Sequence, residues 1–161
     1  MTADALRHFF GYHFSENRTL WDSYVSQLSD EGFTQEPDYA HGSVRNQILH
    51  LIWVDDTWFS GLRGEELPEP FDPADFHSRQ RIRAHWDAVE QKMREYLAEL
   101  RDDMLTDRPL EGEDKELKVW QVLLHVVNRG TDHRAQVLRL LHDLGVRTTS
   151  QDYIFYVYEH P

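Results

Sequence analysis

Four long segments of this chain repeat apolar residues every three or four positions, and this periodicity constrains the fold more than any other feature. Such spacing places the apolar side chains on one face of an α-helix. The segments span residues 3–29, 43 to about 62, 78–104 and 115–145. Ser43 is the expected N-cap of the second segment. A glycine such as Gly145 is typical of a helix end. The pattern predicts an all-α protein, a four-helix bundle that forms one domain over residues 1–161.

The segments between these helices are rich in glycine, proline and acidic residues, which predicts loops at residues 30–42, 64–76 and 106–116. The third loop, residues 106–116, can also contain a short extended segment. Long loops leave the helix order open, because one of them can cross the length of the bundle. The aromatic residues at 148–160 predict a short helix or an extended strap, packed over the bundle's end or into a partner subunit.

Composition and charge exclude several classes of function. The formal net charge is −12, and a phosphate backbone is bound by neutralising it with lysine and arginine, so nucleic acid is not an expected partner. The absence of cysteine excludes disulfides, a thiolate nucleophile and thiolate metal ligands. The first residues lack the pattern of a signal peptide, and no apolar run approaches a membrane span. We therefore expect a cytoplasmic protein with no membrane partner.

Most of the ten histidines do not lie where metal ligands are expected. Four histidines lie in predicted loops or at helix ends and are expected to be solvated: His41, His77, His142 and His160. His8 and His85 have no partner at ligand spacing. His13 lies in the apolar stripe of the first helix, where a histidine is more often a hydrogen-bonded core residue than a ligand. Four tryptophans are expected in the core or an interface: Trp53, Trp58, Trp86 and Trp120.

The remaining histidines lie on the second and fourth helices. His50 is beside the core-facing stripe of the second helix, and the fourth carries His125, Arg129 and His133 at intervals of four. Metal sites in bundles use inward side chains of facing helices. His125 and His133 lie about 12 Å apart along a helix that rises about 1.5 Å per residue, which is too far to share one ion. The fourth helix therefore offers one good ligand at a time, and Asp132 points about 100° away from His133.

Two stretches, SVRNQILHLIWVDDTWFSGLRG (43–64) and HVVNRGTDHRAQVLRLLHDLG (125–145), resemble the DinB/YfiT family of small bacterial four-helix proteins. Residues 14–31 and 152–159 fit the same family. The resemblance implies a bundle, often dimeric, in which three histidines hold a divalent metal, commonly zinc or nickel. One histidine comes from the second helix and two, four residues apart, from the fourth. On this pattern His50 and His133 are metal ligands, and Arg129 replaces the middle ligand.

Arg129 weakens the predicted metal site. A guanidinium has no lone pair to give a metal, and its positive charge disfavours a cation nearby. His125 matches a histidine often present at the start of the family motif, and its distance from His133 suits a supporting hydrogen-bonding role. Asn128 and Gln136 are expected to orient their neighbours in the same way. We therefore predict a weakened or absent metal site between the second and fourth helices.

Three functions remain open. The first is a metal-dependent enzyme, either a thiol-dependent transferase or isomerase or a hydrolase, in which His50 and His133 bind the metal and Arg129 holds an anionic substrate. The second is a metal-free bundle whose Arg129 and histidines bind an anionic small molecule. The third is a structural or dimerising protein in which Arg129 pairs with a carboxylate of a neighbouring helix. The aromatic tail and the long bundle favour a homodimer.

Overall fold

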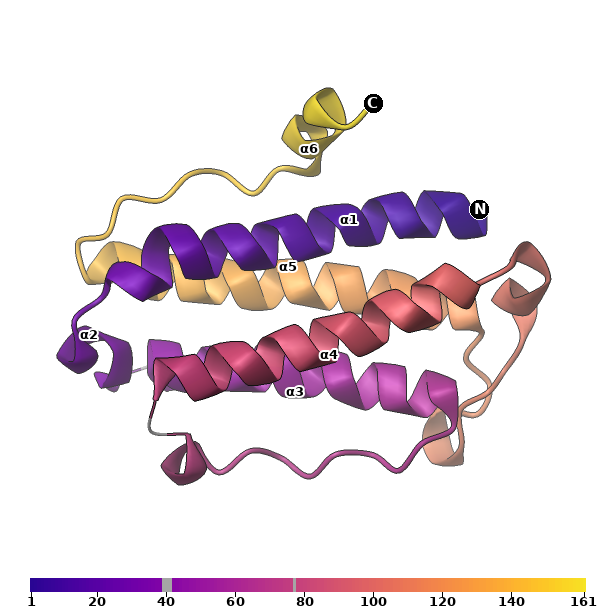
Figure 1. The fold of residues 1–161 in the computed structure, drawn as a ribbon, viewed down its shortest axis with the longest axis horizontal. Helices are drawn as coiled ribbons and strands as arrows, with labels where there is room; N and C mark the ends of the chain where they lie inside the picture. Colours follow the sequence, from indigo (N-terminus) through magenta and orange to yellow (C-terminus); the bar gives the residue numbers. More distant parts are fainter. Residues whose placement is uncertain (39–41, 77) are drawn as a thin grey trace.

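The computed structural model describes the backbone of every residue outside 39–41 and 77, so His41 and His77 lie outside the described residues. Four long helices lie alongside one another (Figure 1): α1 (Ala3–Thr19), α3 (Val44–Arg63), α4 (Arg79–Glu99) and α5 (Val119–Asp143). Two short helices complete the fold: α2 (Asp30–Thr34) and α6 (Tyr153–Glu159). The described residues contain no strand, which confirms the all-α prediction.

The connection between α3 and α4 determines the order of the helices. Residues 64–76 run back along the length of α3, so that α3 and α4 point the same way and α1 and α5 point the other way (Figure 1). The indole Nε1 of Trp53 donates a hydrogen bond of 3.0 Å to the Pro68 carbonyl, which ties this crossover to α3. α1 and α3 each contact both α4 and α5. A long connection of this kind replaces strict up-and-down alternation.

The predicted boundaries of α3 are close to those observed. Its N-cap is Ser43, whose hydroxyl accepts a hydrogen bond from the Asn46 N–H. Gly64 ends the helix in a left-handed conformation with φ of 66°, which glycine adopts at no steric cost. Gly61 lies inside the helix.

Three other predicted boundaries were wrong, because the regular α-helical hydrogen-bonding pattern covers less of the chain than the spacing of apolar residues indicates. The first segment is α-helical only to Thr19, then forms a π turn (Leu20–Tyr24) and a 3₁₀ turn (Val25–Gln27). α4 ends at Glu99 because Leu100 is extended. α5 begins at Val119, since Lys118 is extended as well.

The predicted loops also hold short helical turns. α2 lies within residues 30–42, where the Ser29 hydroxyl caps its first turn. Within residues 106–116, Gly112–Asp114 is a 3₁₀ turn, and no extended strand forms there. A local side-chain cap therefore orders α2 within a segment whose composition alone indicates only a loop.

The apolar stripes of all four long helices meet in a common core. Phe10 of α1 and Phe59 of α3 are fully buried and pack edge to face, with ring centroids 5.5 Å apart. Trp86 of α4 and Leu123 of α5 belong to the same core. Burying each such side chain stabilises the fold by about 1.5–3 kcal/mol. Among the described helices, none combines the length and apolar character that crossing a bilayer requires.

The chain after α5 returns along α1 and ends in α6, so that the two termini lie near the same end of the molecule (Figure 1). Tyr156 of α6 packs on α1, where its hydroxyl lies against Gly11 and its ring is 5.3 Å from that of His8. A side chain at position 11 would occupy the place of that hydroxyl. Ile154 and Phe155 on the same short helix remain exposed.

Candidate functional site

α3 and α5 bring His50 and His133 into contact. Their ring centroids are 4.7 Å apart and their planes meet at 82°. His133 is 1% exposed, and His50 is partly buried beside the ring of Trp53. The two residues lie where α3 and α5 face each other, and these are the helices to which the sequence analysis assigned them. Their role as ligands stays a prediction.

Arg129 lies one helical turn before His133 and is bound to its own helix. Its Nη1 donates to the Asp132 carboxylate at 3.2 Å, and the two side chains are 41% and 54% exposed. Gln136 donates to the same carboxylate oxygen at 3.3 Å. The carboxylate that accompanies Arg129 thus comes from α5 and not from a neighbouring helix. Ion pairs this exposed contribute about 0–1 kcal/mol, so another anion can displace Asp132 at little cost.

The other predicted site residues lie on the surface of α5. His125 is exposed, and its ring packs edge to face on Trp58, with centroids 5.0 Å apart. Asn128 is exposed as well. The structure therefore brings together His50 and His133, keeps Arg129 one turn away, and places His125 one further turn along α5.

The residues present do not complete a metal site of the three-ligand type. Across the part of the chain that the structure describes, no group of three histidine, cysteine, aspartate or glutamate side chains is arranged to hold a metal. His50 and His133 offer two imidazole donors, whereas catalytic zinc sites use three protein ligands and a water. Arg129, at the third position of the family pattern, has no lone pair to offer.

A second polar cluster, which sequence reasoning did not find, lies inside the core. His13 of α1 is fully buried, with Nε2 3.0 Å from the carboxylate of Asp55 on α3. Its Nδ1 lies 3.2 Å from Nη1 of Arg134 on α5. A guanidinium can only donate, so Nδ1 accepts and the Nε2–H donates to Asp55. Asn17 accepts from Arg134 at 2.9 Å, and its amide nitrogen lies 3.1 Å from Nε2. The imidazole therefore bridges a buried cation and a buried anion.

Arg134 also ties this cluster to the segment that leads to α6. Its Nε donates to the Gln151 side chain at 2.9 Å, and its Nη2 donates to the Thr131 hydroxyl at 3.1 Å. The Tyr12 hydroxyl donates to the Gln151 carbonyl at 2.6 Å. Burial lowers the pKa of Arg134 below its ordinary value, while Tyr12 and the carboxylates of Asp55 and Glu16 oppose that shift. The sequence predicted His13 as a hydrogen-bonded core residue but did not predict this cluster. The presence of His13 and Asn17 in one apolar stripe is the sequence feature that could have indicated it.

Comparison with protein families identifies the chain. A family model described as the DinB family matches residues 1–160. The match covers almost the whole chain and confirms the resemblance seen in its second and fourth helical segments. No curated protein matches the chain.

Proposed function

Because the chain belongs to the DinB family, we propose that it is a DinB-type four-helix bundle that binds an anionic small molecule beside His50, Arg129 and His133. One observation carries the proposal: a guanidinium, and not a third metal ligand, accompanies the contact between the two histidines. His50 and His133 lie 4.7 Å apart by ring centroids, and Arg129 is one turn from His133 on the exposed side of α5.

The chemistry of these side chains suits a carboxylate or a phosphate. The planar guanidinium presents paired N–H donors that match two oxygens of either group. Asp132, which occupies this donor now, is more than half exposed and belongs to the same helix, so a ligand can take its place. Histidine donates a hydrogen bond when neutral and adds positive charge when protonated. In a chain with a net charge of −12, such a group of donors is a local exception that favours anions.

A metal-dependent transferase, isomerase or hydrolase is the second candidate. It is favoured by the direct contact of His50 and His133, which belong to helices that supply ligands in the family pattern. Two imidazoles alone leave the donor set incomplete, so this function requires a further ligand from the substrate, for example a thiol, or from another subunit. Both candidates are proposed for a cytoplasmic homodimer, and in both Arg129 contacts the substrate.

The anion proposal is tested by titrating chelator-treated protein with inorganic phosphate and with acetate at constant ionic strength. Ring C–H resonances of the histidines are followed by NMR and assigned with His50→Gln and His133→Gln variants. We expect saturable shifts for His50 and His133. Arg129→Gln should weaken binding at least tenfold, since the charged fork is lost.

Arg139→Gln is the matched control for this titration. Arg139 also lies on α5 and pairs with a carboxylate of the same helix, Asp143, at 3.1 Å. This variant should bind the anions as wild type does. The proposal is wrong if neither anion moves the resonances of His50 and His133, or if Arg129→Gln and Arg139→Gln have the same effect.

A further inference from the structure

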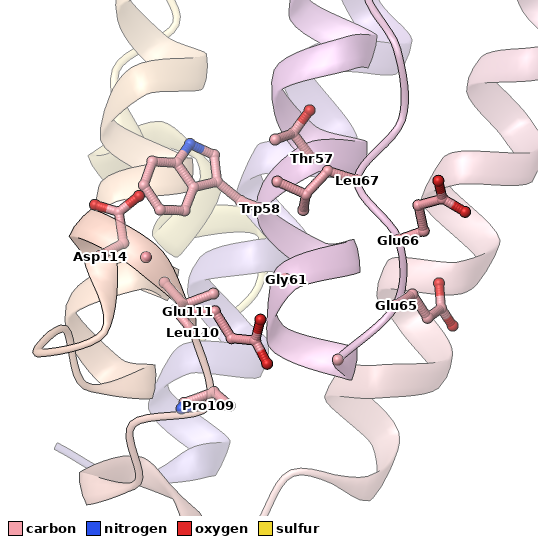
Figure 2. A pocket seen from close by; sticks show the side chains of 12 residues that line it. Thr57, Trp58, Gly61, Glu65, Glu66, Leu67, Pro109, Leu110, Glu111 and Asp114 are labelled. Carbon is pink, nitrogen blue, oxygen red and sulfur yellow. The ribbon is translucent and has the colours of Figure 1, made fainter.

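A cavity of about 580 Å³ opens beside the carboxyl-terminal half of α3 (Figure 2). Its walls come from α3, from residues 64–67 that follow it, and from residues 109–114 that precede α5. This volume lies within the range of about 300–1,000 Å³ that is typical of small-molecule sites. The cavity is separate from the His50–His133 contact, since Trp58 in its wall lies about 12 Å along α3 from His50.

One wall of the cavity is aromatic and apolar. Trp58 is half-buried, and its ring is held edge to face by His125 at 5.0 Å. Figure 2 shows this ring extending from α3 toward the segment that carries Leu110 and Asp114. Gly61 lets Leu110 pack directly against the helix, because a Cβ at position 61 would lie 2.7 Å from Leu110 Cδ2. This wall of the cavity therefore combines the half-buried indole of Trp58 with the apolar side chain of Leu110.

The charged residues of the lining are all acidic. They are Glu65, Glu66, Glu111 and Asp114, and the described part of the lining contains no lysine, arginine or histidine. Arg63 pairs with Glu65 at 2.9 Å. In Figure 2 the side chains of Glu65 and Glu66 extend away from Trp58, whereas Glu111 and Asp114 belong to the segment that the indole faces. Glu111 and Asp114 thus provide the negative charge beside the aromatic wall.

We propose that this cavity binds a small organic cation, an alkylammonium or arylammonium compound whose apolar part contacts Trp58 and Leu110. An indole ring attracts an ammonium group through its negative face, and the attraction grows as the group leaves water. Glu111 and Asp114 supply the countercharge on the opposite side. The acidic residues alone would be an ordinary solvated surface. Beside the aromatic wall of a cavity of this size, they select for positive charge.

The test compares three ligands of similar size at constant ionic strength: benzyltrimethylammonium, benzyl alcohol and benzoate. Binding is measured by isothermal titration calorimetry, and the site is located from the indole N–H resonance of Trp58, assigned with Trp58→Phe. We expect saturable one-to-one binding of the cation, at least tenfold tighter than that of the alcohol. Benzoate should not shift the Trp58 resonance, and any heat it gives belongs to the anion site at Arg129. The proposal is overturned if the cation does not bind, or if the alcohol binds equally well.

Matched variants separate specific recognition from the general negative charge of the protein. Glu111→Gln with Asp114→Asn should weaken binding of the cation at least tenfold. Glu113→Gln with Glu116→Gln removes the same charge from the same segment outside the cavity lining and should change affinity less than twofold. Gly61→Leu should abolish binding, because its side chain would displace Leu110 and reshape the cavity wall. Helix content by circular dichroism verifies that each variant folds. Equal losses in the two double variants would overturn the proposal.

This site and the anion site are independent. Phosphate and acetate report on Arg129, and benzyltrimethylammonium reports on Trp58. Failure of one titration therefore leaves the other proposal standing.

Discussion

Gly130 of α5 lies against the imidazole of His13 on α1, where a Cβ at position 130 would come within 2.6 Å of Nδ1. His13 has no room to retreat, because Asp55 and Arg134 bind its two ring nitrogens. We expect Gly130→Ala to lower the free energy of unfolding by about 1–3 kcal/mol, the usual cost of overpacking. This loss of stability is expected even though alanine favours a helix over glycine by about 1 kcal/mol. Urea denaturation measures the change.

Gly61→Ala is the control for Gly130→Ala. Both glycines lie inside long helices, but the Cβ at position 61 meets the end of a flexible Leu110 side chain instead of a fixed ring. The leucine can move, so this substitution should cost clearly less. A Gly130→Ala protein as stable as wild type would show that α1 and α5 are not in close contact at His13.

Among the charged residues, Arg134 should be the one whose replacement lowers the free energy of unfolding the most. It is 1% exposed and donates hydrogen bonds to Asn17, Thr131 and Gln151. Removing one partner of a buried charged network typically costs about 3–5 kcal/mol, because the remaining charge is left without compensation. We expect Arg134→Met to lose an amount in this range in urea denaturation.

Arg101→Ala controls for the loss of an arginine from the surface. Its ion pair with Asp103 has side chains 67% and 72% exposed, so the change should be within about 0.5 kcal/mol. If Arg134→Met were as mild as this control, the network around His13 would not stabilise the fold.

Stability should fall as pH is lowered through the range where His85 titrates. His85 packs against Phe71 at 4.8 Å. Burial lowers its pKa from the ordinary 6.5, an effect opposed by Asp56 and reinforced by Lys92 and Arg81. Between the folded pKa and about 6.5 the unfolded chain binds more protons, so the free energy of unfolding rises with pH in this window. Acidification from about pH 7.5 to about pH 5.5 should therefore reduce stability.

A His85→Gln variant isolates this contribution. Burial raises the pKa of Glu16, which acts in the opposite direction at lower pH but equally in both proteins. The difference in urea stability between wild type and variant should thus depend on pH only through His85. Parallel pH profiles for the two proteins would contradict the prediction.

Restoring the missing histidine should restore metal binding. We expect wild type, purified without a polyhistidine tag, to carry far less than one equivalent of zinc or nickel by mass spectrometry. Arg129→His adds a third imidazole one turn from His133 and should bring the content to about one equivalent. Arg139→His, with a new histidine elsewhere on α5, should remain empty. A wild-type protein with about one equivalent would instead make the metal-dependent enzyme the leading function.

The protein should be a homodimer. α6 exposes Ile154, Phe155 and Tyr158, at 48%, 53% and 71%, and exposed apolar groups of this kind favour association. Size-exclusion chromatography with light scattering should give twice the chain mass of 19.2 kDa. A monomer at high concentration would refute the prediction.

Features set by short-range interactions were predictable. Periodic apolar positions identified the four long helices, and the Ser43 cap and Gly64 set the limits of α3, because caps and turns depend on residues a few positions apart. The same periodicity placed His50 and His133 on the sides of their helices that face the core. Spacing along one helix also showed that His125 and His133 cannot share an ion.

Features that depend on partners far apart in sequence were not predictable. The crossover at residues 64–76 follows from how α3 and α4 pack, and the bridge from Asp55 through His13 to Arg134 joins three helices. The cavity beside Trp58 forms where residues 64–67 and residues 109–114, far apart in the sequence, meet α3. Local propensity fixes helices and their ends, whereas packing between distant segments decides which side chains meet and where space is left.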